Sequence, residues 1–182
     1  MEPRHTKPNR PGARTPQTAM SLAVFLGLFG GQGLAAGETA PLLKARDSYG
    51  KPVDFAELLE QGRYMVLWFY PKAKLPGCTV QGQRYSGLFG EFMKLKVEVF
   101  GVSRDPASTQ CDFIQKPALK SRMLPDTKGA IAKAFKAGGT FGFYSRDTFL
   151  INPKGKIEMV WRGVNPLKDP DTALAYLKQK QY

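Results

Sequence analysis

The fold is decided by the stretch Tyr64-Met-Val-Leu-Trp-Phe-Tyr70, which is followed by Pro71 and then by Pro76-Gly-Cys78-Thr79. The first seven residues are apolar, aromatic or β-branched, which is typical of a strand that is buried on both faces of a sheet. Apolar residues then recur every three or four positions from Tyr85 to Leu95, which predicts a helix from about Cys78 to Lys94. Cys78 is therefore expected in the first turn of a helix that follows a buried strand.

Strands and helices continue to alternate on the carboxyl side of this unit. The pattern predicts a strand over 96–103, a helix opened by Asp105 as N-cap and Pro106, a short helix over 129–136, a hairpin of 148–151 with 156–161, and a helix from near Pro170. This order predicts an α/β domain with a mixed central sheet and helices on both faces. Residues 37–182 are expected to form that single domain, since about 145 residues is a common domain size.

The first forty residues are organised differently. Residues 1–19 hold four cations and four prolines, Met20 to Phe29 is an apolar run without charge, and small residues follow up to Gly37. This pattern predicts a secretory signal peptide over residues 1–36, with cleavage after Ala36 and with Ala35 and Gly37 as alternative sites. An uncleaved anchor is the competing interpretation, but glycines interrupt the run well short of the roughly 20 residues that a span needs. Met20 is an alternative start. We expect export to the periplasm or another extracytoplasmic compartment.

The charge balance carries little functional information. The chain has a formal net charge of +12, and loss of the leader's four cations and one acid would reduce it to +9. The remaining cations are scattered, with no run of five and no basic helix with interleaved aromatic residues. We expect a solvated basic surface, no nucleic-acid partner, and no membrane partner once the leader is removed.

The histidine count excludes several kinds of chemistry. The chain has one histidine, His5, and it lies in the predicted leader. A mature domain without imidazole has neither a Ser-His-Asp triad nor a Cys-His dyad. Its two cysteines are also too few for the usual four-ligand zinc site. Chemistry in this chain is therefore expected to use Cys, Arg, Lys, Tyr or carboxylates.

Cys78 is the candidate nucleophile. Backbone N–H groups and the helix dipole stabilise a thiolate in the first turn of a helix, which makes such a cysteine reactive. The alternative is a buried and inert cysteine. Lys72, Lys74 and Gly77 favour the reactive interpretation, because they describe an exposed, electropositive loop.

Several segments together resemble one family. They are Trp68-Phe-Tyr-Pro-Lys with Pro-Gly-Cys-Thr79, Gly101-Val-Ser-Arg-Asp105, Leu124-Pro-Asp126, Arg146-Asp-Thr-Phe-Leu-Ile-Asn-Pro-Lys-Gly155 and Val160-Trp161. In this order and spacing, from about Leu42 to Leu177, the chain resembles the peroxiredoxins, in particular the peroxiredoxin Q or bacterioferritin-comigratory branch. The resemblance implies a thioredoxin-like fold and a thiol peroxidase that reduces hydrogen peroxide or organic hydroperoxides in antioxidant defence.

The resemblance also assigns residue roles. It makes Cys78 the peroxidatic cysteine, Pro71 the proline that shields it, and Arg146 the arginine that holds thiolate and peroxide. It implies a thioredoxin-like or small-thiol reductant, a monomer, no cofactor and no metal. From the residues alone, Arg146 could instead be a surface cation beside Asp147.

The sequence departs from the family pattern at three positions. Leu75 stands where the family has the threonine of Pro-x-x-x-Thr-x-x-Cys, Gln81 where it often has glutamate, and Gln83 where it often has a resolving cysteine. Loss of one polar contact to a transition state costs about 10- to 1,000-fold in rate. Thr79 lies beyond the cysteine and is not expected to replace the missing hydroxyl.

Regeneration of Cys78 then depends on Cys111 or on an external thiol. Cys111 lies on the predicted second helix, about one turn before the position near Ile114 where some relatives carry a resolving cysteine. A purely structural disulfide is an alternative. Two other functions stay open: a redox-weakened thioredoxin-fold binding module, suggested by Leu75, and a thiol–disulfide exchanger, disfavoured because no Cys-x-x-Cys is present.

Overall fold

The computed structural model describes Met1 and residues 33–180. The predicted apolar run of the leader lies outside the described residues. Among the helices of the described part, none has both the length and the apolar content needed to cross a membrane.

The core of the molecule is a mixed sheet of five strands built around β3 (Tyr64–Phe69). On one side β3 pairs in parallel with β4 (Val97–Ser103), which pairs in parallel with β5 (Arg122–Pro125). On the other side it pairs antiparallel with β8 (Thr148–Ile151), which pairs antiparallel with β9 (Ile157–Trp161). The strand order is β5-β4-β3-β8-β9, which confirms the predicted mixed sheet.

The central strand is buried on both faces, as its sequence predicts. Residues 65–70 have no exposed surface, and their side chains alternate between two apolar clusters. Met65, Leu67 and Phe69 join the cluster on one face, whereas Val66, Trp68 and Tyr70 join the cluster on the other. The period of two in a strand produces this division.

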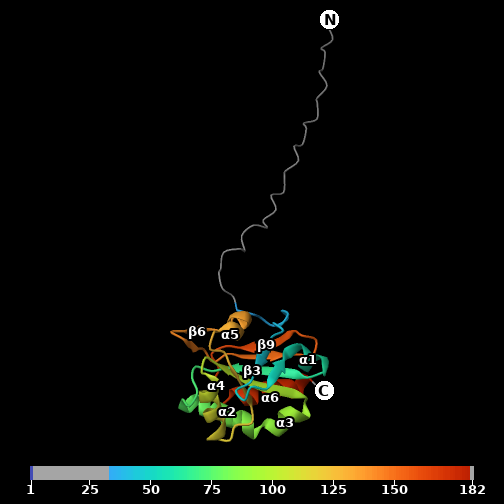
Figure 1. Cartoon of the computed structure of the whole chain (residues 1–182). Helices are drawn as coiled ribbons and strands as arrows, with labels where there is room; N and C mark the ends of the chain where they lie inside the picture. The colour runs from blue at the N-terminus through green and yellow to red at the C-terminus, as the bar shows by residue number, and fades with distance from the viewer. Residues whose placement is uncertain (2–32, 181–182) are drawn as a thin grey trace. The chain divides into compact units, whose positions relative to one another are not determined.

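Helices cover both faces (Figure 1). The first face carries α1 (Phe55–Glu60) and α5 (Ala130–Phe135), whose phenylalanines belong to the first cluster. The second face carries four helices: α2 (Pro76–Gly87), α3 (Phe89–Lys94), α4 (Ala107–Gln115) and α6 (Asp169–Lys180). The terminal helix buries Leu174 and Leu177, as predicted.

Some short elements escaped the sequence prediction. They are α1, β5, and two small hairpins formed by β1 (Lys44–Arg46) with β2 (Pro52–Asp54) and by β6 (Gly139–Thr140) with β7 (Phe143–Tyr144). These strands have two to four residues and little apolar periodicity, so no window of sequence marks them.

Two predicted helix details are wrong. The single helix expected over 78–94 is two helices, because Leu88 leaves helical geometry with φ −94° and ψ 3°, and the first helix already begins at Pro76. Asp105 is not the N-cap of α4. Pro106 holds that position in an extended conformation with ψ 160°, which carries the Asp105 carboxylate away from the first turn of the helix.

The Asp105 carboxylate serves the loop after β3 instead. Its Oδ2 accepts the backbone N–H of Ala73 at 2.7 Å and the hydroxyl of Ser103 at 2.8 Å. The carboxylate therefore ties the loop between β3 and α2 to the carboxyl end of β4.

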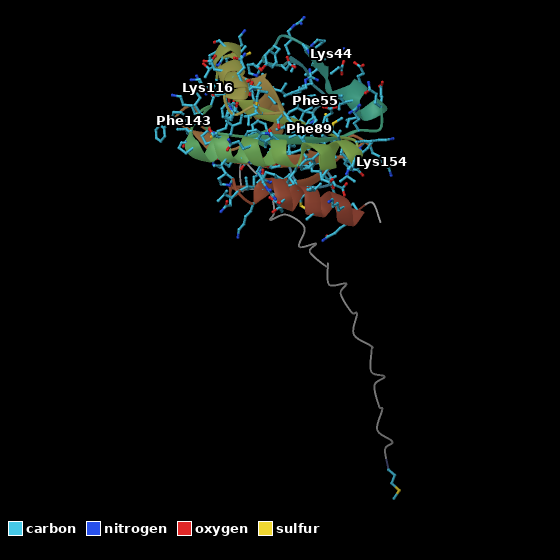
Figure 2. The ribbon with its side chains drawn as sticks, turned by 90° about the horizontal axis from the view of Figure 1, so that it is seen from below. Lys44, Phe55, Phe89, Lys116, Phe143 and Lys154 are labelled. Atoms are coloured by element: carbon cyan, nitrogen blue, oxygen red, sulfur yellow. The ribbon has the colours of Figure 1, made fainter. Side chains whose placement is uncertain are left out.

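Different strand ends and turns lie at the two ends of the sheet. The carboxyl ends of β3 and β4 and the start of β8 lie at one end, because β8 runs antiparallel to β3. The turn of residues 152–155 joins β8 to β9 at the other end. Figure 2 shows this separation, with Phe143 at one edge of the domain and Lys154 at the opposite edge.

Candidate active site

Cys78 is the third residue of α2 and has no exposed surface. The loop before it is exposed at Lys72 and Lys74, as predicted, but the helix turns the thiol inward into the apolar cluster that contains Trp68 and Tyr70. The prediction of an exposed loop is confirmed, whereas the side chain of Cys78 is buried, as in the alternative of a buried cysteine. The thiol is a buried group below an exposed loop.

The first turn of α2 offers backbone donors near this thiol. The first helical hydrogen bond runs from Thr79 N–H to the Leu75 carbonyl at 2.9 Å. The N–H groups of Gly77 and Cys78 precede that bond and so have no partner within the helix. Pro76, at the first helical position, has no N–H to satisfy.

Arg146 reaches the sulfur from the segment just before β8. Its Nη1 donates to Cys78 Sγ at 3.4 Å and to Gln81 Oε1 at 3.2 Å. The structure thus brings together the two residues on which the predicted chemistry depends. The alternative of an ordinary surface cation beside Asp147 is wrong, because Arg146 is half-buried and its guanidinium is engaged by Cys78 and Gln81. The neighbouring Asp147 carboxylate pairs with Arg162 at 2.7 Å.

Asp147 instead holds the backbone next to Arg146. The side chain of Asp147 is buried, and its two oxygens accept the backbone N–H groups of Gly138 at 2.9 Å and Gly163 at 3.2 Å. These bonds join the segments on either side of the start of β8, so the position from which Arg146 extends is fixed by its neighbour.

Gln81 connects Arg146 to a buried carboxylate. Its Nε2 donates to Asp169 Oδ2 at 2.8 Å. Asp169 is the first residue of α6 and is 3% exposed, and the same oxygen accepts the hydroxyls of Tyr85 at 2.7 Å and Thr148 at 3.0 Å. Burial raises the pKa of the Asp169 carboxyl, although the three donors oppose that effect. Burial also raises the pKa of the Tyr85 hydroxyl.

Sequence reasoning missed Asp169. An acid directly before Pro170 at the start of a helix is typical of a helix terminus, and it gives no sign of a contact with α2. The contact joins residues that lie 88 positions apart.

Leu75 occupies the N-cap position of α2 with an extended backbone, φ −64° and ψ 142°. Its side chain is 41% exposed, and it makes no capping hydrogen bond. The hydroxyl of Thr79 donates to the Leu75 carbonyl at 3.1 Å, so it is engaged on the helix backbone. At this edge of the site the structure has an apolar side chain where the family pattern has a hydroxyl.

Two candidates from the sequence remain, Pro71 and Cys111. Pro71 lies two residues after the end of β3 and is half-buried, and its shielding role stays a prediction. Cys111 lies in α4, partly buried, and its Sγ donates to the Ser48 carbonyl at 3.0 Å. Both cysteines are free thiols in this structure.

A first-turn thiol that is hydrogen-bonded to a guanidinium, at the carboxyl end of the central strand of a mixed sheet, defines a thiol-based redox site on a thioredoxin-like fold. The model of the AhpC/TSA family matches residues 36–160. The chain belongs to this family.

Within the AhpC/TSA family, the chain is similar in sequence and in structure to proteins of the bacterioferritin comigratory type. Peroxiredoxin Bcp of Escherichia coli strain K12 is 32% identical over 153 residues, which are 80% of this chain and 97% of that protein. Peroxidoxin BcpB of Mycobacterium tuberculosis superposes with a TM-score of 0.75 at 29% identity, covering 80% of this chain and 97% of the other. The Xanthomonas campestris bacterioferritin comigratory protein, solved in a study of its alkyl peroxide reduction activity, gives 0.72 at 28% identity, with 80% and 100% covered.

Proposed function

We propose that this protein is a thiol peroxidase that uses the Cys78 thiolate to reduce hydrogen peroxide or an organic hydroperoxide. The hydrogen bond from Arg146 Nη1 to Cys78 Sγ is the observation that carries the proposal. The thiolate sulfur forms a bond to one peroxide oxygen as the O–O bond breaks. Cysteine is oxidised to sulfenic acid, and the other oxygen leaves with the bond electrons and is protonated to water or an alcohol.

Arg146 stabilises both ends of this reaction. Its guanidinium stays protonated and presents several N–H donors in a rigid fork, so it can hold the thiolate and also the negative charge that develops on the leaving oxygen. The first-turn N–H groups of Gly77 and Cys78 add fixed dipoles of the same sign. No histidine is needed as a base when the attack begins from the thiolate.

The competing functions have less support. A binding module without redox chemistry would not require the Cys78–Arg146 bond. A thiol–disulfide exchanger of the Cys-x-x-Cys type would require a second thiol at position 75, where the chain has leucine.

We propose that Cys111 resolves the Cys78 sulfenic acid. Attack of the Cys111 thiolate on that sulfur would form the disulfide and release water, and a thioredoxin-like or small-thiol reductant would then reduce the bridge. Cys78 is buried and Cys111 is bonded to the Ser48 carbonyl. Bridging therefore requires the first turns of α2 to unwind and the Cys111 thiol to leave Ser48.

We also propose export to an extracytoplasmic compartment, on the basis of the sequence of the leader, and a monomeric state, which the family resemblance implies. Cleavage after Ala36 would remove Leu34, whose carbonyl accepts Arg162 Nη2 at 3.1 Å. The mass of the protein purified from its native host would give the mature N-terminus and test this proposal.

Stopped-flow measurement of peroxide consumption tests the central proposal. The wild type is expected to react far faster than free cysteine, and Cys78→Ser is expected to abolish the reaction. A wild type no faster than free cysteine would refute the peroxidase function.

Mass spectrometry after one equivalent of peroxide tests recycling. A Cys78–Cys111 bridge is expected in the wild type, and a sulfenic acid trapped on Cys78 is expected in Cys111→Ser. If the wild type also yields sulfenic acid on Cys78 with Cys111 free, Cys111 is not the resolving residue.

A further inference from the structure

We infer that Asp169 is a positioning residue for the peroxidase reaction, acting on Arg146 through the side-chain amide of Gln81. This inference rests on the proposed function and adds a residue from the far end of the chain to its site. Three successive hydrogen bonds connect Asp169 to the thiol, at 2.8 Å to Gln81, 3.2 Å from Gln81 to Arg146, and 3.4 Å from Arg146 to Cys78.

The chemistry of the partners fixes which way the amide points. An ionised carboxylate only accepts hydrogen bonds and a guanidinium only donates them, whereas an amide has one end of each kind. The NH₂ group of Gln81 therefore faces Asp169, and its oxygen faces Arg146. The reversed amide would set oxygen against oxygen and N–H against N–H. Asp169 thereby ensures that Arg146 meets an acceptor.

The surroundings hold Asp169 in place for this role. Its Oδ2 also accepts the hydroxyls of Tyr85, from α2, and Thr148, from β8. Asp169 is itself fixed in the backbone, because its N–H donates to the Asn165 carbonyl at 2.9 Å. A buried carboxylate that gathers donors from two elements specifies one arrangement of α2, β8 and α6.

This arrangement also accounts for glutamine at position 81. A glutamate there would place a second carboxylate against Asp169 at hydrogen-bond distance, and like charges that close cannot both be ionised at little cost. With glutamine at position 81, the negative charge is on Asp169, one residue farther from the thiolate, and the Gln81 oxygen still accepts a hydrogen bond from Arg146.

Asp169→Asn is the first test, and Asp171→Asn is its matched control. Asp171 lies on the same helix but pairs with Arg84 on the exposed surface. We expect Asp169→Asn to lower the second-order rate constant with peroxide by about 10- to 100-fold, as expected when a catalytic group is displaced by a fraction of an ångström to an ångström. The control is expected to react as the wild type does. Equal rate constants for the two variants would overturn the inference.

A double-mutant cycle separates positioning from general damage to the fold. In an Arg146→Lys background the relay of hydrogen bonds from Asp169 through Gln81 has no guanidinium to orient. Adding Asp169→Asn there is expected to lower the rate constant by no more than about 2-fold. A loss in that background as large as in the wild type would mean that Asp169 does not act through Arg146. Gln81→Glu combined with Asp169→Asn is expected to restore most of the rate, since it places a carboxylate directly on Arg146, and failure to restore it would count against the relay.

Alkylation of Cys78 by iodoacetamide, followed across pH in the same variants, needs no peroxide. In Asp169→Asn we expect the pH profile of alkylation to shift relative to Asp171→Asn, and unshifted profiles would overturn the inference. If the wild type failed to consume peroxide while these profiles still differed, the peroxidase function would fail and the relay would stand.

Discussion

A Cβ atom on Gly77 would lie 2.9 Å from Nη2 of Arg146, closer than real Cβ contacts come. The absence of a side chain at Gly77 is therefore what lets the guanidinium lie against the first turn of α2. Pro166 Cγ, at 3.6 Å from the same point, closes the other side. The flexible end of Arg146 can move aside, so a larger residue here would displace its guanidinium rather than disrupt the helix.

Gly77→Ala is accordingly expected to keep the fold and lose activity. Displacement of the guanidinium should lower the peroxide rate constant by about 10-fold or more, while the melting temperature stays the same or rises, because alanine favours the helix. Gly87→Ala, at the other end of α2 with open space around its Cβ, is the control and should keep full activity. Stopped-flow kinetics and thermal melts on both variants check the prediction, which fails if the two are equally active.

Leu75→Thr is expected to raise the rate. The new hydroxyl would restore a polar contact at the edge of the site, and such a contact is worth about 10- to 1,000-fold in a transition state. The loss of the leucine side chain costs little, since it is 41% exposed. Leu75→Val, which has the shape of threonine without its oxygen, should stay at the wild-type rate. A similar gain in both variants would assign the effect to shape and contradict the hydroxyl argument.

The stability of Asp169→Asn relative to the wild type is expected to increase with pH. Burial raises the pKa of Asp169 above the ordinary value of 3.8, so its ionisation is more costly in the folded state than in the unfolded chain. That cost sets in as pH rises from the ordinary value through the raised one, and asparagine does not bear it. The difference in melting temperature, variant minus wild type, should therefore be more positive at about pH 7 than at about pH 4.

Asp171→Asn provides a control of opposite sign. The hydrogen bond from Arg84 lowers the pKa of Asp171, so its contribution to stability is present above the ordinary value and is lost as pH falls. The difference in melting temperature, Asp171→Asn minus wild type, should be more negative at neutral pH than at acid pH. It should also be small, because the ion pair is exposed. The same trend with pH in both variants would contradict the assignment.

Asp105→Ala is expected to loosen the loop that carries Leu75. The substitution removes a buried acceptor from the Ala73 N–H and the Ser103 hydroxyl, which should lower the free energy of unfolding by about 1–3 kcal/mol. Asp112→Ala, which removes an exposed ion pair with Lys74 in the same loop, should lower the free energy of unfolding by much less. Urea unfolding measures both values, and equal losses would show that the loop is not anchored at Asp105.

The sequence predicts those features that depend on residues close together in the chain. The buried strand at 64–70 and the hairpin of 148–151 with 156–161 are confirmed, because period and composition mark them within a few residues. Cys78 was found from its place after a strand, and Arg146 from the family resemblance together with its place at the start of a strand. The depth of Cys78 was not predicted, since it depends on how α2 packs on Trp68 and Tyr70.

The carboxylates show where local reasoning ends. Asp105 and Asp169 both stand before a proline at the start of a helix, and local rules treat them alike as helix-terminal acids. In the structure one binds the loop of residue 73 and the other binds Gln81. These partners are 32 and 88 residues away, a separation that only the folded topology closes.

The turn of residues 152–155 lies at the end of the sheet away from the thiol, and Lys154 at its tip is exposed (Figure 2). Exposed turn tips accept inserted sequence with little cost to the surrounding fold. A fluorescent reporter domain spliced in at Lys154 would be joined directly to β8, the strand that begins two residues after Arg146. The position therefore suits a genetically encoded peroxide sensor, in which the single strand β8 would connect the segment of Arg146 to the inserted fluorescent domain.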